Sequence, residues 1–130
     1  MNVPRDLRFT KTHEWIRLDQ GLVTVGITDF AQEQLSDLTF VELPKVGRKV
    51  AAQEEVAVVE SVKAAADVYA PVTGTIAEAN AAVVNRPDLV NTDPYGAGWL
   101  FKITPADPKD VAPLLDADQY ARTLPGAAGA

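Results

Sequence analysis

Cysteine, histidine and serine, the residues most used for nucleophilic catalysis and for zinc sites, are scarce in this sequence. The 130 residues include no cysteine, one histidine (His13) and two serines (Ser36 and Ser61). Without cysteine there is no thiolate metal site, disulfide or cysteine nucleophile, and one histidine cannot build a multi-histidine metal centre. A triad of Ser61, His13 and Glu14 lacks a nucleophile elbow, and no glycine-rich phosphate loop is present. The sequence therefore indicates a protein that is not an enzyme, with no catalytic and no metal-ligating residues.

One lysine stands apart by its surroundings. Lys63 is the only basic residue in the segment VVESVKAAADVYAPVTG, residues 58–74. Strand-like runs at 54–60 and 65–70 place residues 61–64 in a hairpin turn, where a lysine would project into solvent. A solubilising surface lysine is one interpretation. A functional site is the other, because valine followed by lysine is poor chemistry for a two-residue turn, which favours Asn-Gly or Asp-Gly.

The elements that must position this lysine are short strands separated by turns. Alternating hydrophobic residues in HEWIRLDQGLVTVGI predict a hairpin with Gly21 in its loop. The period then changes, and Thr28 in an N-cap position predicts about two helical turns that end near Ser36. Further strands are expected in LTFVEL, EEVAVVE, ADVYAP, TGTIAEA and GWLFKI.

Helical signals return between and after these strands. One helical turn is expected at 87–90 within a long run of turn residues. Asp107 followed by proline is typical of an N-cap and first helical position, and Asp116 with Gln119 is typical of a capping box. We therefore predict a mainly β fold: a flattened barrel-sandwich hybrid of short antiparallel strands with a few short helices, including C-terminal helical segments.

Length and charge limit the possible partners. The 130 residues suit one domain, 1–130, with a core at about 7–122 and a disordered tail at about 125–130. A net charge of −6 and a pI near 4.6 argue against nucleic-acid binding. The opening residues MNVPRDLRFT are polar, so neither a signal peptide nor a membrane partner is expected. We expect a cytoplasmic monomer.

Five ordered blocks carry a resemblance to a known family. The sequence resembles the H proteins of the glycine cleavage system, which are lipoyl carriers, over roughly residues 7–122. The matching blocks are THEW at 12–15, VGITDFAQEQL at 25–35, FVELPKVG at 40–47, VVESVKAAADVYAPVTG at 58–74 and NTDPYGAGWLFKI at 91–103. In this family the lysine that matches Lys63 carries lipoic acid in amide linkage. The residues around Lys63 in this turn are Glu60, Ser61, Val62 and Ala64.

The resemblance implies a carrier that shuttles the aminomethyl group of glycine. A pyridoxal-phosphate-dependent glycine decarboxylase would load the lipoyl arm, and a tetrahydrofolate-dependent aminomethyltransferase would unload it. Dihydrolipoyl dehydrogenase, with FAD and NAD, would reoxidise the arm. Enzymes that attach lipoate are implied as further partners. The chemistry would belong to the cofactor and the enzymes, while the protein would supply orientation and protection.

The resemblance also implies a pocket for the loaded arm. The aminomethyl group carries an ammonium, and a buried ammonium needs an acid and hydrogen-bond acceptors. The family assigns that role to the position of Glu14, supported by those of Thr12 and Asp67. Judged without the family, Glu14 would be interpreted as an ordinary solvated strand residue, because exposed carboxylates are common. His13 stays open between strand packing and a partner contact.

Two alternatives and three departures accompany this interpretation. The chain could carry or donate lipoate for another complex, or act as an unmodified H-like interaction protein. Lipoyl domains of 2-oxoacid dehydrogenases usually have an acid directly before the lysine, and biotin carriers have flanking methionines; neither pattern occurs here.

The sequence departs from the family pattern at three positions. Gln53 stands where the family often has glycine, Ala66 replaces a commonly polar residue, and Pro113 interrupts a C-terminal helical segment.

Overall fold

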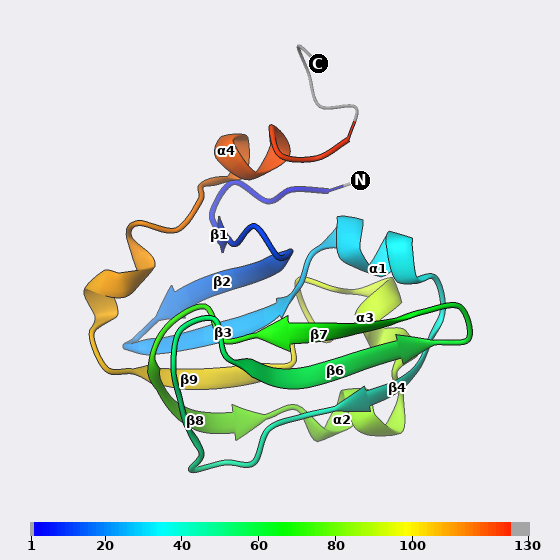
Figure 1. Ribbon diagram of the computed structural model, residues 1–130, viewed down its shortest axis with the longest axis horizontal. Helices are drawn as coiled ribbons and strands as arrows, with labels where there is room; N and C mark the ends of the chain where they lie inside the picture. The colour runs from blue at the N-terminus through cyan, green and yellow to red at the C-terminus, as the bar shows by residue number, and fades with distance from the viewer. Residues whose placement is uncertain (1, 126–130) are drawn as a thin grey trace.

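Nine short strands form two antiparallel sheets in the computed structural model, which describes residues 2–125 (Figure 1). The six-stranded sheet has the order β1 (Arg8–Phe9), β2 (Glu14–Asp19), β3 (Leu22–Ile27), β9 (Phe101–Pro105), β8 (Gly74–Ala79) and β5 (Lys49–Val50). The three-stranded sheet has the order β4 (Leu38–Glu42), β6 (Glu55–Ser61) and β7 (Ala65–Tyr69). The predicted mainly β fold class is confirmed. Of the expected tail at about 125–130, residues 126–130 lie outside the described residues.

Short helices join and flank the sheets. They are α1 (Asp29–Leu35), α2 (Ala81–Asn85), α3 (Asp88–Thr92), the 3-10 helix η1 (Pro108–Val111) and α4 (Ala117–Ala121). Thr28 caps α1 by accepting from Ala31 N–H at 3.3 Å, as its position predicted. The sequence prediction missed α2, which Asn80 caps by accepting from Ala82 N–H at 3.2 Å. Within residues 2–125 no helix has the length and apolar character to cross a membrane.

The predicted hairpin of β2 and β3 is present, and its residue types explain its geometry. Gln20 (φ 52°) and Gly21 (φ 81°) both have positive φ, the combination of a two-residue turn whose twist matches the flanking strands. Farther along β3, Gly26 lies opposite Trp15, and a Cβ at Gly26 would come within 2.5 Å of the Trp15 ring. Glycine is needed there because any side chain would collide with the buried indole.

The turn between Pro71 and Gly74 changes sheets and does not close a hairpin. β7 ends in the three-stranded sheet, whereas β8 pairs with β9 and β5 in the six-stranded sheet. The main core fills the space between the two sheets: Val25 and Ile103 come from one sheet, Val59 from the other. A smaller core packs α4 against β1 and β2 through residues that include Phe9, Trp15 and Tyr120. This second core supports the start of β2, where the candidate site lies.

Candidate functional site

The β6–β7 hairpin presents Lys63 at its tip, where the flanking strands predicted it. Ser61 N–H donates to the Ala64 carbonyl at 2.8 Å, and Ser61 Oγ accepts from the N–H groups of Lys63 (3.2 Å) and Ala64 (3.1 Å). The serine hydroxyl thus supports a turn that lacks Asn-Gly chemistry. Val62 is 93% exposed, Lys63 is exposed, and no acidic side chain within residues 2–125 forms a salt bridge with it.

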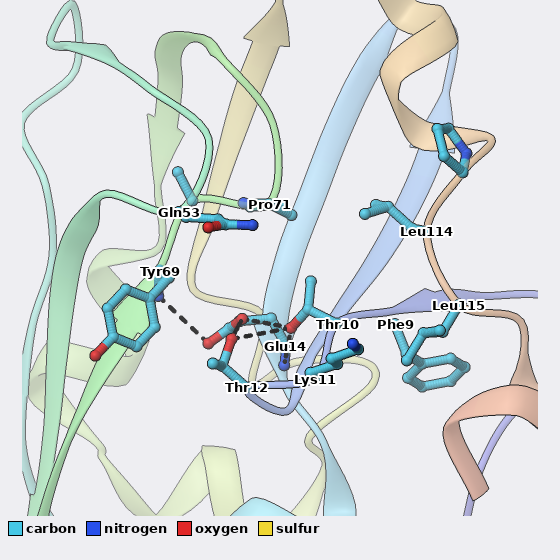
Figure 2. Close-up of a pocket in the computed structure, with 12 residues that line it drawn as sticks. Phe9, Thr10, Lys11, Thr12, Glu14, Gln53, Tyr69, Pro71, Leu114 and Leu115 are labelled. Carbon is cyan, nitrogen blue, oxygen red and sulfur yellow. Dashed lines mark hydrogen bonds between the residues drawn. The ribbon is translucent and has the colours of Figure 1, made fainter. Parts of the chain in front are cut away.

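Glu14, at the first position of β2, is a buried carboxylate with an exposed fraction of 1%. Its Oε1 accepts from the hydroxyls of Thr10 and Thr12, each at 2.5 Å, and its Oε2 accepts from the Tyr69 N–H at 3.3 Å (Figure 2). Tyr69 is the last residue of β7, so the two sheets meet at this carboxylate. All three donors are neutral.

Burial dominates the electrostatics of Glu14. Desolvation raises the pKa of Glu14 above its ordinary value, while the hydrogen bonds from Thr10, Thr12 and Tyr69 oppose the rise. No lysine or arginine in the part of the chain that the structure describes forms a salt bridge with it. A buried carboxylate without a cationic partner is costly, so the site is suited to receive a cation from outside the chain.

The segment before β2 holds Glu14 through its own backbone. Thr10 N–H donates to the Glu14 carbonyl at 3.0 Å, and His13 N–H donates to the Thr10 carbonyl at 3.2 Å. His13 closes this turn with a φ of 72°, which is uncommon for a residue with a side chain. Thr28 N–H then donates to the His13 carbonyl at 3.0 Å, so the turn is also fixed to the start of α1.

Two cavities meet at Glu14. One, of about 250 Å³, lies between the hairpin and α1; its lining is mostly apolar and includes Val59, Ala66, Phe30 and Leu35 together with Glu14. We call it the arm cleft. The other, of about 470 Å³, shares Thr12 and Glu14 with the arm cleft, and its lining residues are Phe9, Thr10, Lys11, Thr12, Glu14, Gln53, Tyr69, Ala70, Pro71, Pro113, Leu114 and Leu115 (Figure 2).

The other residues expected at the site lie as follows. Thr12 contacts Glu14 directly. Asp67 lines the arm cleft but has no hydrogen bond to Glu14; it is an exposed residue of β7, and its carboxyl raises the pKa of Glu55 by hydrogen bonding and by charge. Glu60 pairs with Ala65 across the hairpin.

Sequence reasoning missed two groups at Glu14. The Thr10 hydroxyl and the Tyr69 N–H both bind the carboxylate. The Thr10 hydroxyl had no periodic signal, because residues 10–13 form a turn and not an extended strand. Tyr69 N–H had no sequence signal, because every residue type except proline supplies a backbone donor.

The structure shows how the chain accommodates its three departures from the family pattern. Gln53 adopts a φ of 71°, so the turn keeps a left-handed residue although glycine is absent. Ala66 lines the arm cleft and adds to its apolar wall. Pro113 follows η1, which ends at Val111 and is a short 3-10 helix.

Fold and site together define a class of protein. A rigid β scaffold presents one exposed lysine on a hairpin, and a cleft that ends at a buried acid lies beside that hairpin; this is the architecture of a non-catalytic carrier with a swinging arm. The family model described as glycine cleavage H-protein matches residues 7–126. The chain belongs to this family, and it is a lipoyl carrier of the glycine cleavage system.

Individual relatives agree along most of the chain. It is 55% identical over 124 residues to the glycine cleavage system H protein of Psychrobacter sp. (strain PRwf-1), which covers 95% of this chain and 98% of that protein. It is 56% identical over 119 residues to that of Halorhodospira halophila (strain DSM 244 / SL1), covering 91% and 92%. The crystal structure of a glycine cleavage system H protein from Mycobacterium marinum superposes with a TM-score of 0.85 at 45% identity, covering 92% of this chain and 97% of that chain.

Proposed function

We propose that lipoic acid is attached to Lys63 and that the arm cleft and Glu14 hold the loaded arm between visits to the partner enzymes. The observation that carries this proposal is the burial of Glu14 without a basic partner in the described residues. An ammonium on the arm would supply the missing cation. Glycine decarboxylase, aminomethyltransferase and dihydrolipoyl dehydrogenase are the partners that the carrier serves. A cytoplasmic location and a monomeric state stay predictions.

Lys63 suits covalent attachment for two reasons. Its side chain is exposed, and the turn that holds it is stabilised by backbone and Ser61 contacts, so acylation would break no contact of the lysine. Ala66 lines the arm cleft only three residues from Lys63, which limits their Cα separation to about 11 Å. Glu60, Ser61, Val62 and Ala64 would be the residues that an attachment enzyme meets first.

The arm cleft suits the cofactor chemically. When bound, lipoic acid supplies a flexible hydrocarbon chain and a disulfide that accepts the aminomethyl group. The apolar lining from Val59, Phe30 and Leu35 matches a hydrocarbon chain, and the acid at its end matches an ammonium. Thr10 and Thr12 keep the carboxylate in place for that contact.

Exclusion of water is the expected benefit of this cleft. Water that reaches the aminomethyl carbon breaks its bond to sulfur, which restores the thiol and releases formaldehyde and ammonia. A carrier must avoid this loss while it moves between enzymes. Glu14 would lower the frequency with which the loaded arm leaves the cleft, because departure would leave a buried carboxylate without its counterion.

Attachment is tested with Lys63→Arg, which keeps the charge but cannot form the lipoyl amide. Intact mass after treatment with a lipoate-attachment enzyme should show the lipoyl increment in the wild type and none in the variant, with loss of glycine cleavage. The free energy of unfolding should stay within about 0.5 kcal/mol of wild type, as at other exposed positions. Undiminished glycine cleavage by Lys63→Arg would refute the assignment of this lysine.

Protection is tested with Glu14→Gln and the control Glu42→Gln, which alters an exposed carboxylate on β4. Lipoylated protein is loaded with glycine and glycine decarboxylase, separated from the enzyme and kept without tetrahydrofolate. Loss of a partner for a buried charge costs about 1–3 kcal/mol. Formaldehyde release should therefore be faster in Glu14→Gln by about tenfold, and unchanged in Glu42→Gln. Equal rates in all three proteins would show that the protection comes from elsewhere.

A further inference from the structure

Tyr120 connects the C-terminal helix to the arm cleft. Its side chain is fully buried, and its ring stacks on Phe9 at 4.7 Å with an interplanar angle of 10°. The hydroxyl lies 2.8 Å from His13 Nδ1 and 2.7 Å from Thr28 Oγ1. The tyrosine therefore contacts two residues that are fixed to the site, although α4 contributes no lining residue to either cavity.

The two partners of Tyr120 hold adjoining parts of the cleft wall, one as a lining residue and the other as the cap of α1. His13 lines the arm cleft, directly precedes Glu14 and holds a φ of 72°. Thr28 caps α1, and Phe30 in the first turn of α1 packs against the His13 ring with centroids 4.8 Å apart. One hydroxyl thus holds the turn before Glu14 and the start of α1 in a fixed relation.

The hydrogen bonds around this hydroxyl favour one direction. Thr28 is buried, and its Oγ1 already accepts from Ala31 N–H, so its single hydrogen needs an acceptor. Tyr120 Oη is the acceptor present in the described residues. The Tyr120 hydrogen then donates to His13 Nδ1, which leaves His13 neutral with its hydrogen on Nε2. The opposite direction would leave the Thr28 hydrogen buried without an acceptor, at a cost of a hydrogen bond.

A neutral His13 suits the cargo of the cleft. Burial lowers the pKa of His13, in agreement with the hydrogen-bond direction. A cationic imidazole beside an arm that carries an ammonium would repel it, because like charges in a partly buried site interact strongly. The arrangement therefore keeps Glu14 as the charged group that the ammonium meets.

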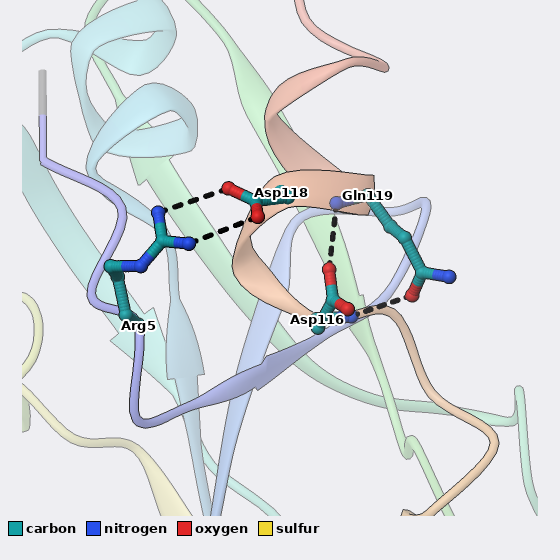
Figure 3. Close-up of polar contacts among 4 residues, drawn as sticks. All are labelled: Arg5, Asp116, Asp118 and Gln119. Carbon is teal, nitrogen blue, oxygen red and sulfur yellow. Dashed lines mark hydrogen bonds and ion pairs between the residues drawn. The ribbon is translucent and has the colours of Figure 1, made fainter.

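α4 is stabilised by contacts at its N-terminal turn and by an ion pair with the N-terminal segment. Asp116 accepts from Gln119 N–H at 2.8 Å, and the Gln119 side chain accepts from Asp116 N–H at 2.9 Å, which forms the predicted capping box (Figure 3). Arg5 adds two hydrogen bonds to Asp118, at 3.0 and 2.9 Å, on the exposed side of the helix (Figure 3). The capping box stabilises the first turn of α4 and the exposed ion pair adds a modest contact, whereas the buried Ala117 and Tyr120 hold the helix on the second core.

We propose that Tyr120 is a positioning residue for the loaded arm: its hydroxyl holds His13 neutral and joined to Thr28, and so fixes the wall of the arm cleft beside Glu14. The inference rests on the proposed function of that cleft. It gives the C-terminal helix a role in retaining the cargo, in addition to covering the second core.

The test uses Tyr120→Phe in full-length, tag-free lipoylated protein. The variant keeps the ring and removes the hydroxyl. Tyr95→Phe is the matched control, because the Tyr95 hydroxyl also makes two hydrogen bonds, to Asn2 O (2.6 Å) and from Asp29 N–H (2.9 Å), without contacting His13. Glu14→Gln serves as the reference for loss of the proposed function. Release of formaldehyde from loaded protein is measured for all four proteins at equal folded fraction.

Nitrogen NMR of the His13 imidazole shows which ring nitrogen carries the hydrogen. A tyrosine that served only to pack the core would not change this signal when its hydroxyl is removed. His13 is the only histidine in the sequence, so its two ring nitrogens give an unambiguous spectrum. We expect the wild type and Tyr95→Phe to show hydrogen on Nε2 and an accepting Nδ1. In Tyr120→Phe the Nδ1 signal should shift as it loses its donor, and release of formaldehyde should be about three- to tenfold faster, the effect of one lost hydrogen bond.

A second variant removes the His13 partner of the Tyr120 hydroxyl. His13→Asn removes the imidazole but keeps a residue type that tolerates positive φ. It should accelerate release by itself, and adding Tyr120→Phe should accelerate it little further, because both changes break one interaction. Fully additive effects would overturn the proposal.

The remaining outcomes separate the two proposals. Faster release in Glu14→Gln, with Tyr120→Phe equal to Tyr95→Phe, would overturn the role of Tyr120 and leave the proposed function intact. Normal release in Glu14→Gln with faster release in Tyr120→Phe would support the positioning role and refute the role of Glu14. Hydrogen on Nδ1 of His13 in the wild type would overturn the hydrogen-bond direction on which the proposal depends.

Discussion

The Thr10 hydroxyl binds Glu14 at both its backbone and its side chain. It accepts from Glu14 N–H at 3.1 Å and lies 2.5 Å from Glu14 Oε1, to which it donates. One hydroxyl therefore fixes the backbone at the start of β2 and the direction of the carboxylate. The Thr12 hydroxyl contacts Glu14 only at the carboxylate, and it also lies 3.2 Å from the Thr10 hydroxyl. Of the two threonines, Thr10 is the one that also holds the Glu14 backbone.

Replacement of this hydroxyl should weaken the retention of cargo. Thr10→Val keeps the shape but leaves the buried Glu14 N–H without its acceptor, and we expect a loss of about 1–3 kcal/mol in the free energy of unfolding. Formaldehyde release from loaded protein should also accelerate. Thr10→Ser, which restores the hydroxyl, should recover most of both properties. If the serine variant is as impaired as the valine variant, the hydroxyl alone does not account for the effect of Thr10.

Glu14 should give the protein a distinctive dependence of stability on pH. Burial raises the pKa of Glu14 above its ordinary value of 4.5, so the folded protein binds this proton more tightly than the unfolded chain does. The tighter binding of this proton stabilises the folded protein. The stabilisation is fully present below pH 4.5 and is lost as the pH rises through the raised pKa of Glu14 in the folded state.

Urea unfolding of wild type and Glu14→Gln from about pH 4 to about pH 8 tests this linkage. The stability of the wild type relative to the variant should fall as the pH rises, because glutamine does not titrate and the other groups cancel in the difference. A difference that is constant with pH would mean that Glu14 titrates as an ordinary exposed carboxylate.

Gln53→Gly should stabilise the protein. Gln53 holds a φ of 71°, which costs a residue with a side chain about 1–2 kcal/mol. Its N–H donates to the Ala70 carbonyl at 2.6 Å, a bond that glycine keeps. Glycine also loses more conformational entropy on folding, which offsets part of this relief. The net increase in the free energy of unfolding should be about 0.5–1 kcal/mol, measured by urea unfolding. Gln53→Ala is the control and should give no gain, because alanine has the same preference against positive φ.

Gly26→Ala should be severely destabilising. The new Cβ would lie 2.5–2.7 Å from three atoms of the fully buried Trp15 ring, whose Nε1 donates to the Pro94 carbonyl at 2.8 Å. Displacement of a packed indole costs about 1–3 kcal/mol or more. Gly21→Ala in the exposed β2–β3 turn has open space and should cost only the strain of a positive φ, about 1 kcal/mol. Equal losses in the two variants would contradict the packing argument.

Sequence alone determined the features that depend on neighbours along the chain. Residue types a few positions apart predicted the hairpin that carries Lys63, the cap of α1 at Thr28 and the capping box of α4. The family resemblance rested on five sequence blocks that occur in the family's order. Local rules also had limits: α2 was missed, because its Asn80 cap stands in an alanine-rich segment with little periodicity.

Tertiary structure decided the environment of Glu14. Its contact with Tyr69 N–H joins residues 55 positions apart, and the contact between His13 and Tyr120 joins residues 107 positions apart. Hydrophobic periodicity shows which face of a strand is buried but not which distant donor meets a given carboxylate. That depends on how the two sheets and the C-terminal helix pack together. The sequence by itself therefore indicated the lysine that we propose as the attachment point of the arm, and the packing of the sheets formed the cleft in which we propose that its cargo is held.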